Sequence, residues 1–98
     1  MNFAQKMRLI WIDATLHRVG NLQRGDLIRA FGISVPQASK DIQTFIARWP
    51  DSIEYDKSAR WYFRRNRAGN VFPEHVHHWV RGSVHAVGDQ HITKEPSE

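Results

Sequence analysis

The stretch FGISVPQASKD, from Phe31 to Asp41, contains the end of one predicted helix, a turn and the start of the next helix. Gly32 suits the left-handed conformation in which many helices end. Ser34 is a favoured N-cap residue, and Gln37 three positions later completes a Ser-x-x-Gln capping box. The stretch therefore predicts a helix over residues 23–31, a short turn, and a second helix over residues 35–48, which Pro50 stops.

Apolar residues before this unit predict another helix over residues 3–18, which Gly20 and Asn21 end. The helix has two apolar stripes on nearly opposite sides. One stripe contains Phe3, Met7, Ile10, Trp11 and Ala14, and the other contains Leu9, Ile12 and Leu16. Both sides must be covered, one by the domain core and the other by the C-terminal segment or a second subunit.

After Pro50 the pattern changes to that of a β-hairpin. Ile53 and Tyr55 alternate with acidic residues, residues 61–63 are strong strand formers, and residues 57–60 form a polar turn between them. The order of elements predicts an α+β fold, a winged helix-turn-helix of three helices and a two-stranded hairpin wing, with a short C-terminal extension.

The C-terminal part is harder to interpret. Pro73 favours a short helix after it, Gly82 and Gly88 argue against a long one, and a second hairpin through residues 79–87 is nearly as plausible. We expect residues 1–72 to form a DNA-binding domain, residues 73–88 an extension and candidate dimerisation element, and residues 89–98 a disordered polar tail.

The helix over residues 35–48 has the properties of a recognition helix. At helical spacing its apolar residues cluster on one side, and the opposite face is made of amides, hydroxyls, a lysine and small residues. Asp41 falls at the edge of that face, beside Arg48. Gln can pair with adenine, and Lys can reach guanine acceptors in the major groove. An ordinary solvated face is the alternative. The predicted DNA-binding residues are Ser34, Pro36, Gln37, Ser39, Lys40, Gln43, Thr44 and Arg48.

Two interpretations compete at Gln37. As the capping-box partner, its side chain would fold back onto the backbone of Ser34. As a base reader, it would point into the groove. One side chain does not do both at once.

The hairpin adds positive charge beside the recognition helix. A cationic tip can follow the sugar-phosphate backbone or enter the minor groove. The predicted contacts are Lys57, Ser58, Arg60, Arg64, Arg65 and Arg67. A charged tip that only aids solubility is the alternative. If Trp61 or Tyr62 were on the surface, stacking on single-stranded bases would be a second alternative.

Composition supports an acidic partner and argues against an enzyme. The 98-residue chain has a net charge of +4, and residues 1–72 carry 12 Lys or Arg against 6 Asp or Glu. It has no cysteine, which fits a protein of a reducing cytoplasm. We find no signal peptide, no membrane-spanning run and no catalytic motif, and therefore predict no catalytic residues and no membrane partner.

Five of the six histidines lie beyond Pro73. His75 and His78 would share a helix face and, with Glu74, could hold zinc. A solvated helix is the more ordinary explanation. We therefore predict no metal site, no cofactor and no small-molecule ligand.

Between Arg8 and Asn66 the sequence resembles the N-terminal DNA-binding domain of WYL-domain bacterial transcriptional regulators, in the branch that represses phage-defence operons. The resemblance rests on Asp26-Leu27, on residues 31–34, on Pro36 to Ser39 with Asp41, and on Pro50 followed by Tyr55-Asp56 and Tyr62. It implies a domain that reads operator DNA as a homodimer. Because the WYL domain does not follow, we expect a stand-alone relative, of phage or mobile-element origin, or a fragment.

We accordingly expect a sequence-specific duplex-DNA regulator, a repressor acting as a homodimer, since one recognition helix reads only a few base pairs. Its predicted dimer interface comprises Leu9, Ile12, Leu16, Val76, Trp79 and Val80. The first three of these residues form one apolar stripe and the last three form another near the C-terminus, and the two stripes could instead cover each other within one chain. A winged helix used for protein contact is the rival function, and it would need a more apolar face on the helix over residues 35–48.

Overall fold

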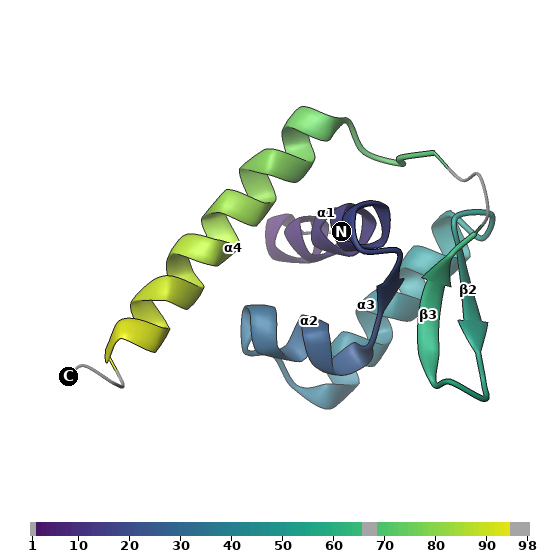
Figure 1. The fold of residues 1–98 in the computed structure, drawn as a ribbon, viewed down its shortest axis with the longest axis horizontal. Coiled ribbons are helices and arrows are strands. Elements are labelled where there is room, and N and C mark those ends of the chain that lie inside the picture. The colour runs from purple at the N-terminus through teal and green to yellow at the C-terminus, as the bar shows by residue number, and fades with distance from the viewer. Residues whose placement is uncertain (1, 66–68, 95–98) are drawn as a thin grey trace.

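The computed structural model describes residues 2–65 and 69–94, with side chains described as far as Val84. Its helices are α1 (Phe3–Arg18), α2 (Arg24–Phe31), α3 (Val35–Arg48) and α4 (Glu74–Lys94). Its strands are β1 (Asn21–Leu22), β2 (Ile53–Asp56) and β3 (Trp61–Arg64). Figure 1 shows α1, α2 and α3 packed together, with β2 and β3 on one side of them and α4 on the other. The predicted α+β winged helix-turn-helix is thus confirmed.

The sheet has three strands rather than the two predicted. The order is β1-β3-β2, and both pairings are antiparallel. Leu22 lies opposite Tyr62 in one pairing, and Tyr55 lies opposite Tyr62 in the other. A strand of two residues carries no periodicity, so β1 could not be recognised before its partner strand was placed.

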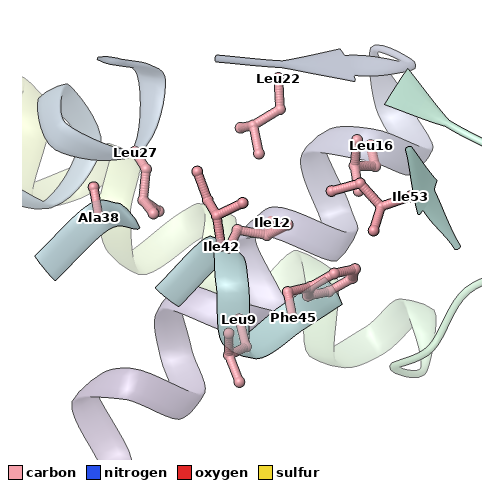
Figure 2. Close-up of a cluster of buried hydrophobic side chains, with 9 residues drawn as sticks. All are labelled: Leu9, Ile12, Leu16, Leu22, Leu27, Ala38, Ile42, Phe45 and Ile53. Atoms are coloured by element: carbon pink, nitrogen blue, oxygen red, sulfur yellow. The ribbon is translucent and has the colours of Figure 1, made fainter. Parts of the chain in front are cut away.

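One face of α1 lies in the centre of the core. Leu9, Ile12 and Leu16 are at most 2% exposed and pack with side chains of α2, α3, β1 and β2 (Figure 2). The prediction that these three residues form a dimer interface is therefore wrong. Within the chain, α2, α3 and the sheet cover this stripe, and α4 lies against the other stripe, of which Phe3 stays 65% exposed. The cluster comprises Leu9, Ile12, Leu16, Leu22, Leu27, Ala38, Ile42, Phe45 and Ile53.

Residues of α4 cover the remaining apolar side of α1. Val80 is fully buried, so the prediction that it lies in a dimer interface is also wrong. Val76 is half-buried, while Trp79 is 51% exposed and meets the ring of Phe3 edge-on, with 5.9 Å between the ring centroids. The predicted interface is thus largely taken up within the chain, but its two stripes do not cover each other. The stripe of α1 faces α2, α3 and the sheet, and Trp79 of α4 is left partly uncovered.

A buried aspartate of α1 connects α4 to the rest of the fold. Asp13 Oδ2 accepts hydrogen bonds from the backbone N–H groups of Val71 and Phe72, at 3.1 and 2.9 Å. The same oxygen lies 2.6 Å from Nε2 of His77, which is also buried. These contacts fix the approach to α4 and its first turns against α1.

α4 is longer than the sequence predicted. It continues through Gly82 and ends at Lys94, so residues 79–87 are not a hairpin and residues 89–94 are helical rather than an irregular tail. A glycine inside a helix costs about 1 kcal/mol relative to alanine, which a helix of this length can tolerate. Residues 95–98 of the predicted tail lie outside the described residues.

Candidate nucleic-acid interface

The turn between α2 and α3 has the predicted geometry. Gly32 ends α2 with φ 65° and ψ 31°, and its N–H donates to the carbonyl of Ile28 at 2.7 Å. Ser34 then caps α3, because its Oγ accepts a hydrogen bond from the N–H of Gln37 at 3.2 Å. Pro36 lies in the first turn of α3, where its missing N–H leaves no helical hydrogen bond unmade. Local chemistry therefore sets where the recognition helix starts.

α3 presents the predicted polar face to solvent. Ser34, Pro36, Lys40, Gln43 and Arg48 are exposed. The remaining three predicted residues of this helix are half-buried, and two of them use their hydroxyls within the protein. Thr44 Oγ1 donates to the carbonyl of Lys40 at 2.9 Å, and Ser39 Oγ accepts from Arg24 at 3.1 Å. Seven of the eight residues thus lie on α3 and Ser34 caps it, and Lys40, Gln43 and Arg48 are the polar side chains that it exposes.

Asp41 occupies a different place from the one predicted. It is fully buried, not at the edge of the exposed face beside Arg48. Its carboxylate is paired with the Nε of Arg8 on α1, and it accepts a longer hydrogen bond, of 3.3 Å, from Gln5. These α1 donors make burial of the charge tolerable, and they could not be found from the α3 sequence alone.

At Gln37 the structure shows neither competing interpretation in full. Its backbone N–H completes the Ser34 cap, but its side chain does not return to Ser34. Nε2 of Gln37 instead donates to Oδ1 of Asp41 at 2.9 Å. The amide therefore stays at the partly exposed N-terminal end of the recognition helix.

Local hydrogen bonds fix the conformation of the turn at the tip of the β2–β3 hairpin. Oδ1 of Asp56 accepts from the N–H groups of Ser58 and Ala59, at 2.9 and 3.2 Å. Arg60 has φ 60°, and its N–H donates to the carbonyl of Asp56 at 2.8 Å. Lys57, Ser58 and Arg60 are all exposed, so the tip projects two cations into solvent.

The arginines after the hairpin are directed to different places. Arg65 is exposed, and its Nε donates to the carbonyl of Pro50 at 3.1 Å. Arg64 is half-buried, with Nη1 3.2 Å from Nδ1 of His17 at the end of α1. Arg67 lies outside the described residues. Arg64 and Arg65 are thus engaged with different parts of the fold, His17 on α1 and the carbonyl of Pro50.

Three further residues lie beside Ser39 or in the wing and were not among the predicted duplex-DNA contacts. Arg24 at the start of α2 donates to Ser39, and Tyr55 and Tyr62 pair across β2 and β3 with ring centroids 4.7 Å apart. Burial raises the pKa of Tyr62, Tyr55 raises it further, and the charge of Arg24 opposes both. The Tyr62 hydroxyl therefore keeps its proton at neutral pH and can donate to a phosphate. The sequence signal that could have identified Arg24 is its place as the first residue of α2, the helix before the turn.

The candidate zinc ligands of the sequence, His75, His78 and Glu74, all lie among the residues that the structure describes. His75 and His78 are exposed on the first turns of α4, and no group of three or more His, Asp or Glu side chains there is placed to hold a metal ion. No described helix is both long and apolar enough to cross a membrane.

A helix-turn-helix with a polar second helix, flanked by a small antiparallel sheet with a basic tip, defines the winged helix-turn-helix class. Within that class, the chain belongs to the family of the BrxR transcriptional regulator winged helix-turn-helix domain, whose sequence model matches residues 4–78. This result confirms the predicted resemblance to the DNA-binding domain of WYL-domain regulators. The family is one of transcriptional regulators and not of enzymes.

Curated relatives point in the same direction. The chain is 45% identical over 60 residues to the DNA-binding transcriptional repressor CapW of Escherichia coli (strain KTE188). This alignment covers 61% of this chain and 20% of the relative. It is 41% identical over 71 residues to CapW of Pseudomonas aeruginosa, which covers 72% of this chain and 24% of the relative. It is 37% identical over 62 residues to CapW of Stenotrophomonas maltophilia, and this alignment covers 63% of this chain and 21% of the relative. The aligned part of the chain thus spans about a fifth to a quarter of the length of these relatives.

Proposed function

We propose that the chain binds duplex DNA in a sequence-specific manner and represses transcription. The observation that carries the proposal is the exposed face of α3, which holds Lys40, Gln43 and Arg48 and no carboxylate. The one acidic residue of the helix, Asp41, is buried and paired. A carboxylate on that face would repel the phosphates of a groove. The name of the CapW relatives, DNA-binding transcriptional repressor, supports both parts of the proposal.

In this proposal α3 lies in the major groove and the wing lies along the backbone. Lys40 and Gln43 are exposed on the outer face of α3 and can reach base edges. Lys57 and Arg60 project from the hairpin tip and contact phosphates, as does Arg24 near Ser39. Ile53 at the start of β2 belongs to the same core cluster as Ile42 and Phe45 of α3, so the hairpin begins against this helix, which fits one DNA segment reaching both.

We further propose a homodimer, although the surface for it is smaller than the sequence suggested. Leu9, Ile12, Leu16 and Val80 are core residues, which leaves Val76 and Trp79 of the predicted interface. Trp79 is 51% exposed and Phe3 beside it is 65% exposed, so together they form an aromatic patch on α1 and α4. Sedimentation of the wild type and of Trp79→Glu at micromolar concentration tests this, and a wild type that stays monomeric would refute it.

The rival functions have less support. A protein-docking α3 should be apolar outside, whereas three of its six exposed residues are polar or charged, namely Lys40, Gln43 and Arg48. The other three are Val35, Pro36 and Ala47. Single-strand stacking needs exposed aromatics on β3, but Trp61 and Tyr62 are both half-buried. Duplex binding therefore remains the proposal that fits the side chains best.

The test is binding of the full chain to the promoter DNA upstream of its own gene, compared with random duplex, at several salt concentrations. Lys57→Ala and Arg60→Ala should weaken binding to both DNAs alike and lower the salt slope by about 0.9 for each phosphate that is no longer neutralised. Gln43→Ala and Thr44→Ala should mainly reduce the preference for the promoter, by about 1–3 kcal/mol per misread base pair.

Arg81→Ala is the matched control for the removal of a positive charge, because Arg81 lies on α4, across the molecule from the wing in Figure 1. It should leave both the affinity and the salt slope nearly unchanged. Binding that does not depend on salt would refute the proposal of duplex binding. An unchanged promoter preference in the α3 variants would refute the role assigned to α3.

A further inference from the structure

The hydrogen bonds around Asp41 orient one amide at the DNA-facing end of α3. Oδ1 of Asp41 accepts from Nε2 of Gln37 at 2.9 Å and from Nε2 of Gln5 at 3.3 Å, while Oδ2 is paired with the Nε of Arg8. Nη2 of Arg8 also lies 3.4 Å from Oδ1. The carboxylate is fully buried, and the side chain of Arg8 is only 11% exposed. Both residues are therefore fixed by packing as well as by charge.

A carboxylate only accepts hydrogen bonds, and this property decides which way the Gln37 amide points. The amide must turn its NH₂ group toward Asp41, because its carbonyl oxygen would be repelled there. Oε1 and the second N–H of Gln37 are then left for an outside partner. An acceptor next to a donor is the pattern that pairs with N6 and N7 of adenine in the major groove.

We infer that Asp41 and Arg8 are positioning residues, which set the Gln37 amide in the orientation that reads an adenine although neither contacts the base. The inference rests on the proposed function and adds a residue-level mechanism to it. Gln37 lies in the first turn of α3, and recognition helices contact base edges mainly through their N-terminal residues. A side chain ordered before binding also loses less rotamer entropy on binding.

The decisive variant is Asp41→Asn. Arg8 must keep an acceptor, so the new amide turns its oxygen to Arg8 and its NH₂ group to Gln37. The Gln37 amide must then reverse, presenting two donors outward in place of an acceptor and a donor. Asp41→Asn should therefore change which base is preferred at one base pair. At that same base pair, Gln37→Met should lower the preference for the favoured base by about 5- to 100-fold.

The experiment selects preferred sites from a pool of random-sequence duplexes with the full chain and its variants. Asp41→Asn should alter the preference at one position in the wild type and cause no further change there in the Gln37→Met background. A purely structural role would weaken binding in both backgrounds and leave the preferred base unchanged, which would overturn the inference. Gln5→Ala is the matched control, since it removes the longer hydrogen bond to the same carboxylate and should leave the preference unchanged.

A second measurement needs no variant and remains decisive if Asp41→Asn does not fold. In the wild-type chain the side-chain NH₂ of Gln37 should have an NMR order parameter close to that of the α3 backbone, while that of the exposed Gln43 side chain should be clearly lower. Equal mobility of the two amides would overturn the inference. A wild type that selects no preferred sequence would instead overturn the proposed function, so the two failures can be told apart.

Discussion

Two buried aspartates join helices to α1, and they do so with different partners. Asp41 on α3 accepts from the side chains of Arg8, Gln5 and Gln37. Asp13 on α1 accepts from two backbone N–H groups, at residues 71–72, and lies against a buried histidine of α4. The junction of α3 is thus an ion pair between side chains of two helices. The junction of α4 instead binds the backbone of the segment that leads into the helix.

This difference predicts different consequences when each junction is broken. At the α3 junction, loss of the carboxylate leaves a largely buried arginine charge without compensation, which affects the whole core. At the α4 junction, loss of the acceptor leaves backbone N–H groups unpaired at residues 71–72, which opens the approach to α4 first. The α3 junction should therefore contribute to global stability, and the α4 junction should show local opening.

The largest effect is expected for Asp41→Ala. Without its partner, the guanidinium of Arg8 stays in a site where its side chain is 11% exposed, so the free energy of unfolding should fall by about 3–5 kcal/mol. That is a large share of the roughly 5–15 kcal/mol typical of a domain. Urea denaturation followed by circular dichroism measures it. Asp51→Ala, at an exposed position, is the control and should change stability by about 0.5 kcal/mol or less.

The next effect is expected for Asp13→Asn, which keeps one acceptor oxygen but places an NH₂ group among three donors. We expect a loss of about 2–3 kcal/mol in the free energy of unfolding. Hydrogen exchange should quicken at Val71 and Phe72 more than at the amides of α3. Uniform loss of protection in both regions would mean that the two junctions do not differ in the way described.

A smaller loss is expected for Gly32→Ala at the turn before α3. An added Cβ would meet nothing within 4 Å, so the cost comes from φ 65° alone, about 1–2 kcal/mol for a residue other than glycine. Thermal unfolding should show the corresponding fall in Tm. If the substitution were neutral, the left-handed cap would not be what limits the choice of residue at this turn.

The smallest effect, and the only gain, is expected for Gly82→Ala in α4. This glycine lies within the helix, and an added Cβ again meets nothing within 4 Å, so helix propensity should raise stability by about 0.5–1 kcal/mol. Replacing glycine by alanine should thus lower stability at Gly32 and raise it at Gly82, although an added Cβ has equal space at both positions. A loss at Gly82 would indicate that the helix depends on contacts that a methyl group disturbs.

Much of the fold follows from local patterns. The helices over residues 3–18 and 35–48 have the predicted bounds, and the hairpin turns at residues 57–60 as expected. The turn between α2 and α3 was recognisable because Gly32, Ser34 and Pro36 each favour one particular backbone feature there. The eight predicted residues of the recognition helix share one helix for the same reason, since helical spacing alone decides which residues lie on the same face.

The errors fall where distant segments meet. The stripe of Leu9, Ile12 and Leu16 was assigned to a dimer because periodicity shows that a face is apolar but not what covers it. The burial of Asp41 depends on Arg8, which is 33 residues away in the sequence. β1 exists because β3 pairs with it, and α4 continues past Gly82 although no local signal required it.

By itself, the sequence determined where the three helices and the hairpin lie, where the turn falls and which α3 residues are polar, because capping, glycine conformations and periodicity act within a few residues. Only the tertiary structure decided which apolar stripe forms the core, which carboxylates are buried and which way Gln37 points. These outcomes depend on donors and surfaces supplied by other elements, and a buried charge is tolerated only once its partner has been brought to it.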